Sequence, residues 1–92
     1  MTIHRFLMTF QPAPDAFERA REFEDEEKAY LVRNHAAGTL LTSGRFADVS
    51  RGAIGIFTTR EAAEEFVKHD PFFLNGIVSA WTIDEWVEVV GS

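Results

Sequence analysis

Alternating hydrophobic residues near the start of the chain predict a first β-strand. In residues 3–10, Phe6, Met8 and Phe10 fall on one face of an extended segment that is rich in β-forming residues. The next four residues, 11–14, include two prolines, which cannot donate a hydrogen bond to a neighbouring strand. We therefore expect the first strand to end at Phe10.

A long run of good helix formers follows and predicts a first helix over residues 16–37. Asp15 is placed to cap its N-terminus, and acidic residues crowd its first turns, where they favour the positive end of the helix dipole. Gly38 provides a C-terminal stop. The pattern indicates one continuous helix.

Two further strands are predicted in the middle of the chain. Residues 39–46 and 53–58 are typical of strands, and a polar connection of ordinary hairpin length, residues 47–52, joins them. We expect these two strands to pair antiparallel.

The last third of the chain predicts a second helix and a final strand. Thr58 with Glu61 three residues later forms a capping box, and the helix that it opens should end at Asp70-Pro71. Residues 77–90 form a last extended stretch, for which we expect a bend near Asp84-Glu85.

The resulting order of elements, βαββαβ, predicts a fold in the α+β class. This order is typical of the ferredoxin-like arrangement, an antiparallel four-stranded sheet with two helices on one face. The opposite face of the sheet then needs a cover, and two subunits meeting face to face would form a dimeric α+β barrel. We expect residues 1–92 to form a single domain.

Composition narrows the classes of function. A chain that is 46% hydrophobic is expected to fold. Because a chain of 92 residues buries only a modest fraction of its surface on folding, association into a homodimer would add stability. Its net charge of −6 argues against nucleic-acid partners, and it has no membrane-spanning run and no cysteine. We expect a cytoplasmic protein whose partner is a small molecule and which uses no cofactor.

An acid interrupts the hydrophobic stripe of the first helix. Glu27 falls on the face defined by helical spacings, whereas the neighbouring acids are typical of a solvated face. Two interpretations remain open: a side chain at the edge that reaches water, or a pocket carboxylate with a raised pKa. The other members of the stripe are Ala20, Phe23, Tyr30, Leu31 and Asn34.

A second candidate acid lies in the segment Asp70-Pro71-Phe72-Phe73. Asp70 is explained equally well as the cap of a short helix and as a general base, or a group that orients one, beside Glu27. His69 is adjacent and is the histidine we would expect to act as a proton shuttle, with a solvated surface residue as the alternative. The spacing of the three histidines matches no dedicated metal motif, so we expect no metal site.

Strand residues 39–46 offer polar groups for a substrate. Ser43 supplies a hydroxyl, and Arg45 supplies a cation that either grips a substrate carboxylate or phenolate or neutralises Glu27 or Asp70. For the apolar part of a ring-shaped substrate, we expect packing against Tyr30, Phe72 and Phe10.

Several segments together resemble the YCII-related family. The most specific is Asp70-Pro71-Phe72, and the resemblance spans most of the chain. The other segments are Tyr30-Leu31, Gly38-Thr39-Leu40-Leu41-Thr42-Ser43-Gly44, Glu61-Ala62-Ala63, Asn75-Gly76-Ile77-Val78 and Trp81.

The resemblance implies small cytoplasmic dimers of ferredoxin-like subunits, similar to muconolactone isomerase. One branch of the family resembles dehydrochlorinases of chlorinated hydroxyhydroquinones, with a site that pairs a histidine of the first helix with the aspartate of Asp-Pro. That aspartate corresponds to Asp70 and the histidine to Glu27, while Arg45 stands where the family commonly has proline.

The sequence therefore supports two classes of function. The first is a cofactor-independent lyase, isomerase or dehydrohalogenase that moves protons on a small cyclic or aromatic substrate, with Asp70, Glu27 and His69 as candidate acids and bases. The alternative is a non-catalytic dimer that binds a small molecule or assists another enzyme.

Overall fold

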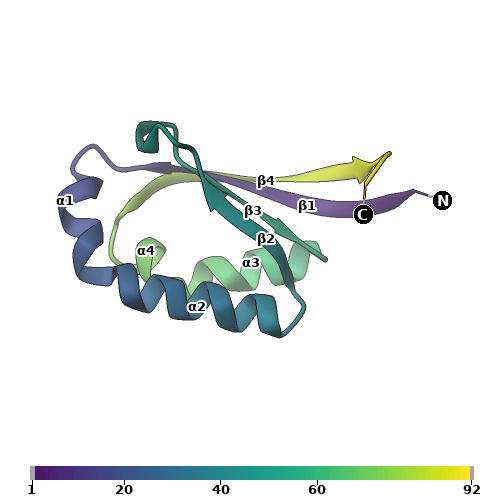
Figure 1. Ribbon diagram of the computed structural model, residues 1–92, viewed down its shortest axis with the longest axis horizontal. Helices are drawn as coiled ribbons and strands as arrows, with labels where there is room; N and C mark the ends of the chain where they lie inside the picture. Colours follow the sequence, from purple (N-terminus) through teal and green to yellow (C-terminus); the bar gives the residue numbers. More distant parts are fainter. Residues whose placement is uncertain (1, 92) are drawn as a thin grey trace.

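The computed structural model describes residues 2–91 as a sheet covered on one face by helices (Figure 1). The predicted ferredoxin-like α+β arrangement is confirmed. Its elements are β1 (Ile3–Pro12), α1 (Ala16–Ala20), the 3-10 helix η1 (Arg21–Phe23), α2 (Glu24–Ala36), β2 (Leu40–Arg45), the 3-10 helix η2 (Val49–Arg51), β3 (Ala53–Phe57), α3 (Arg60–His69), α4 (Pro71–Leu74) and β4 (Val78–Glu88).

The four strands form one antiparallel sheet in the order β2-β3-β1-β4. In the ladder, Met8 of β1 lies opposite Gly55 of β3 and Ile83 of β4. Met8 is fully buried, so the even-numbered residues of β1 and their partners face the helices. The predicted antiparallel pairing of the two middle strands is confirmed.

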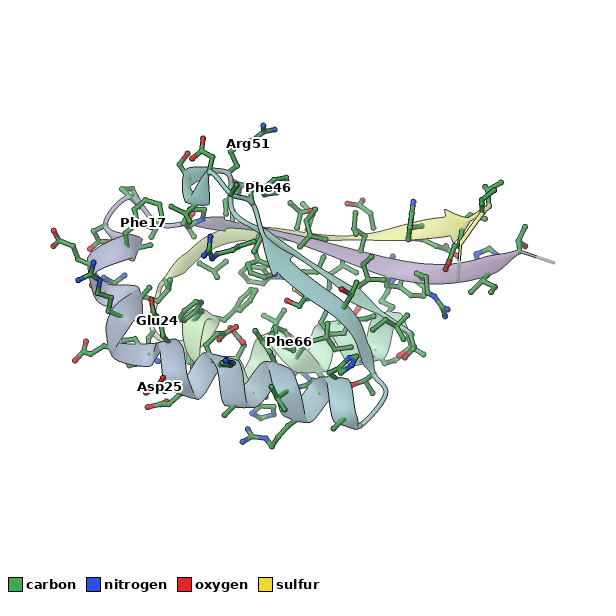
Figure 2. The ribbon with its side chains drawn as sticks, in the orientation of Figure 1. Phe17, Glu24, Asp25, Phe46, Arg51 and Phe66 are labelled. Carbon is green, nitrogen blue, oxygen red and sulfur yellow. The ribbon has the colours of Figure 1, made fainter. Side chains whose placement is uncertain are left out.

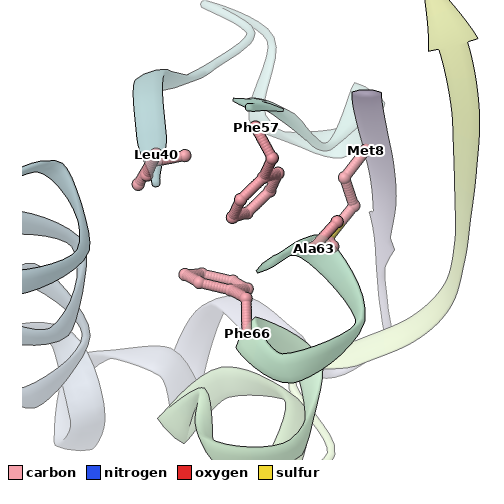
Figure 3. Close-up of a cluster of buried hydrophobic side chains, with 5 residues drawn as sticks. All are labelled: Met8, Leu40, Phe57, Ala63 and Phe66. Atoms are coloured by element: carbon pink, nitrogen blue, oxygen red, sulfur yellow. The ribbon is translucent and has the colours of Figure 1, made fainter. Parts of the chain in front are cut away.

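The hydrophobic core lies between α3 and the sheet (Figure 3). The rings of Phe57 and Phe66 meet edge to face, with centroids 5.1 Å apart. All core side chains are at most 2% exposed, which is the packing expected of a small, well-filled interior. The cluster consists of Met8, Leu40, Phe57, Ala63 and Phe66.

The other face of the sheet carries apolar side chains that no helix covers. Leu7, Ile54 and Ile56 lie on this face because they alternate with the buried positions of their strands. Trp86 is on the same face, opposite Arg5, and is 44% exposed. The monomer therefore leaves a partly apolar surface open.

The helix predicted over residues 16–37 is wrong in its continuity, because η1 divides it. The Arg19 guanidinium donates hydrogen bonds of 2.8 Å to the carbonyls of Asn75 and Gly76, which fastens α1 to the turn before β4. α1 thus follows the end of the sheet, and α2 runs across its face (Figure 1). Asp15 stands at the N-cap position but pairs with Arg19 at 3.1 Å and caps no N–H.

The predicted capping box of Thr58 and Glu61 is wrong, because the N-cap lies one residue later and Ala62, three positions after it, has no polar side chain to complete a box. Thr59 caps α3, because its Oγ1 accepts the N–H of Ala62 at 3.0 Å. Thr58 remains part of the sheet region, where its N–H donates to the Thr39 carbonyl at 3.0 Å. The end of this helix at Asp70 is as predicted.

The two long strands, β1 and β4, differ from the predictions in their details. β1 continues to Pro12, which pairs with Val78 after a shift in register and needs no donated hydrogen bond there. At Asp84-Glu85, where a bend was expected, both residues stay in an unbroken ladder with β1, so the strand is not interrupted there. Within residues 2–91, no helix has the length and hydropathy needed to cross a membrane.

Candidate functional site

Two carboxyl groups from distant parts of the chain meet between the helices and the sheet. Glu27 extends inward from α2 and is 6% exposed, and Asp70, between α3 and α4, is fully buried. The helical spacing that put Glu27 on the hydrophobic stripe therefore identified a buried acid. The neighbouring acids are exposed, as Asp25 shows on the outer side of α2 (Figure 2).

One backbone N–H holds the two carboxyl groups together. The N–H of Phe72 lies 3.1 Å from Oδ2 of Asp70 and 3.3 Å from Oε1 of Glu27. The N–H of Phe73 adds a second hydrogen bond to Oδ2 of Asp70, at 3.2 Å. Asp70 is thus the N-cap of α4, as one interpretation of the sequence predicted, and at the same time the partner of a second acid.

Burial and mutual repulsion favour one shared proton on this pair. Burial, followed by the hydrogen bond and charge of Asp70, raises the pKa of Glu27 from 4.5 to about 9. Burial also raises the pKa of Asp70, but hydrogen bonds from Glu27, Phe73 and Phe72 stabilise its charged form. Within the pair, these interactions favour the proton on Glu27 and the negative charge on Asp70.

This assignment also accounts for an otherwise unpartnered atom. Oδ1 of Asp70 is buried and receives no hydrogen bond from any N–H or hydroxyl of the described residues. The side chains of Glu27 and Asp70 lie within hydrogen-bonding reach, and a proton on Glu27 provides a donor for Asp70. The two carboxyl groups are therefore arranged to share one proton.

Tyr30 lies beside the pair and does not line the cavity described below. Its hydroxyl donates to the carbonyl of Phe66 at 2.9 Å, and the same carbonyl accepts the N–H of Asp70 at 3.0 Å. The phenol ring packs on the ring of Phe66, with centroids 4.9 Å apart. Tyr30 therefore fixes the end of α3 that presents Asp70.

Next to the pair, a cavity of about 580 Å³ opens between α1 and the sheet; we call it the Arg45 pocket. Its roof is formed by α1 and the start of α2, and its end wall by the connection between β2 and β3. The residues that line it are Phe10, Pro12, Ala16, Phe17, Ala20, Glu24, Arg45, Val49, Gly52, Ala53, Phe72, Ile77 and Val78.

The floor of the Arg45 pocket is one row of neighbouring side chains on the sheet. Arg45 of β2 lies opposite Ala53 of β3, which lies opposite Phe10 of β1. The methyl groups of Ala53 on the floor and of Ala16 and Ala20 above it fill little of the space between the layers. Small side chains at these three positions leave the hollow.

The predicted substrate contacts separate into two groups. Arg45, Phe10 and Phe72 all line the Arg45 pocket. Ser43 is exposed and borders a separate groove at the β2 edge, which it shares with Arg45. Within residues 2–91, Arg45 forms no ion pair, so the structure does not place it as the group that neutralises Glu27 or Asp70.

His69 lies apart from the carboxyl pair. Its ring is exposed, and Nε2 lies 3.1 Å from a carboxylate oxygen of Glu65 on the outer face of α3. The helix turns this side chain outward although it precedes Asp70 directly in sequence. No group of three or more potential metal ligands occurs in the described part of the chain.

Most of the lining of the Arg45 pocket was not identified from the sequence, including its acidic residue, Glu24, and the ring of Phe17. Glu24 lies one helical turn before Glu27 on α2, and this spacing was the available signal. Phe17 is 47% exposed on α1, where a large aromatic ring in an otherwise polar turn was the signal. Figure 2 shows both at the end of the molecule where α1 meets the sheet.

A family model and several solved structures match this chain. The model of the YCII-related domain matches residues 4–87. A search of curated proteins found no match to the sequence.

Two of the matching structures share the fold at low sequence identity. One is 5-chloro-2-hydroxyhydroquinone dehydrochlorinase (TftG) from Burkholderia phenoliruptrix AC1100, in complex with 2,5-dihydroxybenzoquinone: its TM-score is 0.74 at 21% identity, over 89% of this chain and 92% of that chain. The other is PA3566 from Pseudomonas aeruginosa, with a TM-score of 0.60 at 18% identity, over 98% of this chain and 97% of that chain.

Proposed function

Because the chain belongs to the YCII-related domain family, in which a structural neighbour is a dehydrochlorinase, we propose that it is a cofactor-independent enzyme of proton transfer. Its substrate is a small cyclic or aromatic molecule, and its reaction is that of a lyase, isomerase or dehydrohalogenase. The observation that carries the proposal is the buried pair of Glu27 and Asp70, in which two carboxyl groups lie side by side and the proton favours Glu27.

In the proposed mechanism, the two acids exchange roles in one cycle. The Asp70 carboxylate takes a proton from a carbon or hydroxyl group next to a carbonyl, and the protonated Glu27 gives its proton to another atom of the substrate. Arg45 lines the pocket and holds the anionic group of the substrate. A proton returns from Asp70 to Glu27 through their hydrogen bond, which restores the starting state.

Access to the pair depends on Phe72 in this proposal. Phe72 lines the Arg45 pocket and its N–H contacts both carboxyl groups, while neither acid lines the pocket itself. Turnover therefore requires the Phe72 side chain to move aside when substrate enters. His69 has no role here, since it is bound to Glu65 on the outer surface.

Deuterium exchange tests this proposal without requiring the natural substrate to be known. We would incubate the protein in D2O with a panel of cyclic enones, phenols and hydroxyquinones and follow solvent deuterium in each ring by NMR. The chloride released from 5-chloro-2-hydroxyhydroquinone would be measured in parallel. Asp70→Asn should lower any exchange or release about 10²–10⁴-fold while the fold is retained.

A non-catalytic binding protein is the second candidate function. It is favoured by the burial of the two carboxyl groups, because neither of them lines the Arg45 pocket where a ligand would bind. A panel compound that binds but exchanges deuterium no faster than it does with Asp70→Asn would contradict the enzyme and support the binding protein.

We further propose a homodimer that buries the open face of the sheet. The apolar side chains of Leu7, Ile54, Ile56 and Trp86 support it, because they share a surface that no helix covers. Sedimentation velocity should give a dimer for the native chain and a monomer for Ile56→Glu. A native chain that sediments as a monomer at micromolar concentration would contradict the dimer.

A further inference from the structure

Arg45 has no ion pair and lies over no aromatic ring within residues 2–91. The other arginines of the described chain that have charged or aromatic neighbours are satisfied by them: two pair with carboxylates, and three lie over aromatic rings. Arg45 does neither, and Arg21, which also does neither, does not line this pocket. The satisfied residues are Arg5, Arg19, Arg33, Arg51 and Arg60. A guanidinium in this setting is available to a ligand anion.

The remaining walls of the pocket fit a flat ring. Phe10, Phe17 and Phe72 contribute aromatic surface from the sheet, α1 and α4 respectively. Aliphatic side chains and alanines complete the lining. A volume of about 580 Å³ falls in the usual range for small-molecule sites, roughly 300–1,000 Å³.

Glu24 restricts the charge and the polar groups of such a ligand. It is the acidic residue of the pocket lining, and it forms no ion pair with any described residue, Arg45 included. Its carboxylate accepts a hydrogen bond from a ligand hydroxyl and repels a second negative charge. The pocket therefore suits a ligand with one anionic group and a hydroxyl.

We propose that the Arg45 pocket binds a small hydroxylated aromatic carboxylate, with its carboxylate on Arg45 and its ring among Phe10, Phe17 and Phe72. The inference names the substrate class of the proposed enzyme and in that respect rests on the proposed function. The binding itself is measured without turnover, so the two proposals fail separately.

Trp81 provides a reporter for binding in this pocket. It lies opposite Phe10 in the ladder, and its ring packs on that of Phe73 with centroids 5.2 Å apart. The chain has two tryptophans, and Trp86 lies on the opposite face of the sheet. Trp86→Phe therefore leaves a fluorophore beside the pocket floor as the only tryptophan.

The experiment titrates the Trp86→Phe protein with hydroxybenzoates, benzoate, benzamide and phthalates, by fluorescence and by calorimetry. We expect a hydroxybenzoate to bind more tightly than benzoate, and neutral benzamide or a doubly charged phthalate to bind at least about tenfold more weakly than benzoate. Arg45→Gln should weaken benzoate about tenfold or more and leave benzamide unchanged.

Arg51→Gln is the matched control, since it removes the same charge from the same β2 to β3 region without altering the pocket lining. Equal weakening by Arg45→Gln and Arg51→Gln, or equal binding of benzoate and benzamide, would overturn the proposal, as would no binding of any probe at millimolar concentration. Asp70→Asn should bind benzoate normally. If that variant and the native chain both bind but neither exchanges deuterium, only the proposed enzyme activity fails.

Discussion

The space between the helices and the sheet is filled under α3 and hollow under α1. Under α3, the side chains of Phe57, Phe66 and Met8 pack together and are at most 2% exposed. Under α1, the facing side chains of both layers include alanines, and a cavity remains. One sheet thus supports a filled half and a hollow half, and the size of a few side chains decides which is which. The two buried acids lie at the border.

The largest effect should come from the filled half. Phe66→Ala removes a ring that is 2% exposed and contacts both Phe57 and Tyr30, so we expect a loss of about 3–5 kcal/mol in the free energy of unfolding. Urea denaturation measures it. A loss below about 1 kcal/mol would show that this half is not tightly packed.

At the border, the stability of the protein should depend on pH through Glu27. Its pKa is raised from 4.5 to about 9 on folding, so the folded state binds the proton more tightly and loses stability as pH rises between these values. We expect a decline of about 2–4 kcal/mol between roughly pH 5 and 9. Glu27→Gln keeps a donor for Asp70 and should flatten the profile. An unchanged slope in urea titrations of this variant would assign the dependence to another group.

A smaller effect separates the two roles of Asp70. Asp70→Ala leaves the N–H groups of Phe72 and Phe73 without their cap, and we expect it to cost about 1–2 kcal/mol more than Asp70→Asn, whose side-chain oxygen still accepts both hydrogen bonds. Thermal unfolding of the two variants compares them. Equal stabilities would mean that the cap contributes nothing.

The smallest effect on stability should come from the hollow half. Ala20→Leu places a larger side chain in the Arg45 pocket, and we expect the free energy of unfolding to change by less than about 1 kcal/mol because open space receives it. The same variant should abolish benzoate binding in the fluorescence titration. Strong destabilisation would indicate that the pocket cannot be filled without displacing α1.

The fold was predictable because its signals are local. Alternation in residues 3–10 and the helix formers of residues 60–69 depend on neighbours along the chain, as did the burial of Glu27 on its helical stripe. The break at η1 was not predictable, because it depends on Arg19 reaching carbonyl groups more than fifty residues away. Local pattern contains no information on that contact.

The candidate site was predictable only in part, for the same reason. Strand register and helix position bring together Arg45, Phe10 and Phe72. The sequence identified each of them as a candidate, but it could not show that they line the same pocket. Tyr30 has a suitable residue type, but its hydroxyl is engaged by the Phe66 carbonyl, and His69 is turned outward by the helix that carries it. Such orientations follow only from tertiary packing.

The hydrogen bonds of Arg19 fasten the roof of the pocket to the body of the protein. α1 has five residues, too few to be stable alone, and the guanidinium ties it to the turn that leads into β4. Breaking this one attachment should release the roof without melting the sheet, a local opening that amide hydrogen exchange resolves from global unfolding. The residence time of a bound ligand would then depend on how often the hydrogen bonds between Arg19 and the carbonyls of Asn75 and Gly76 break.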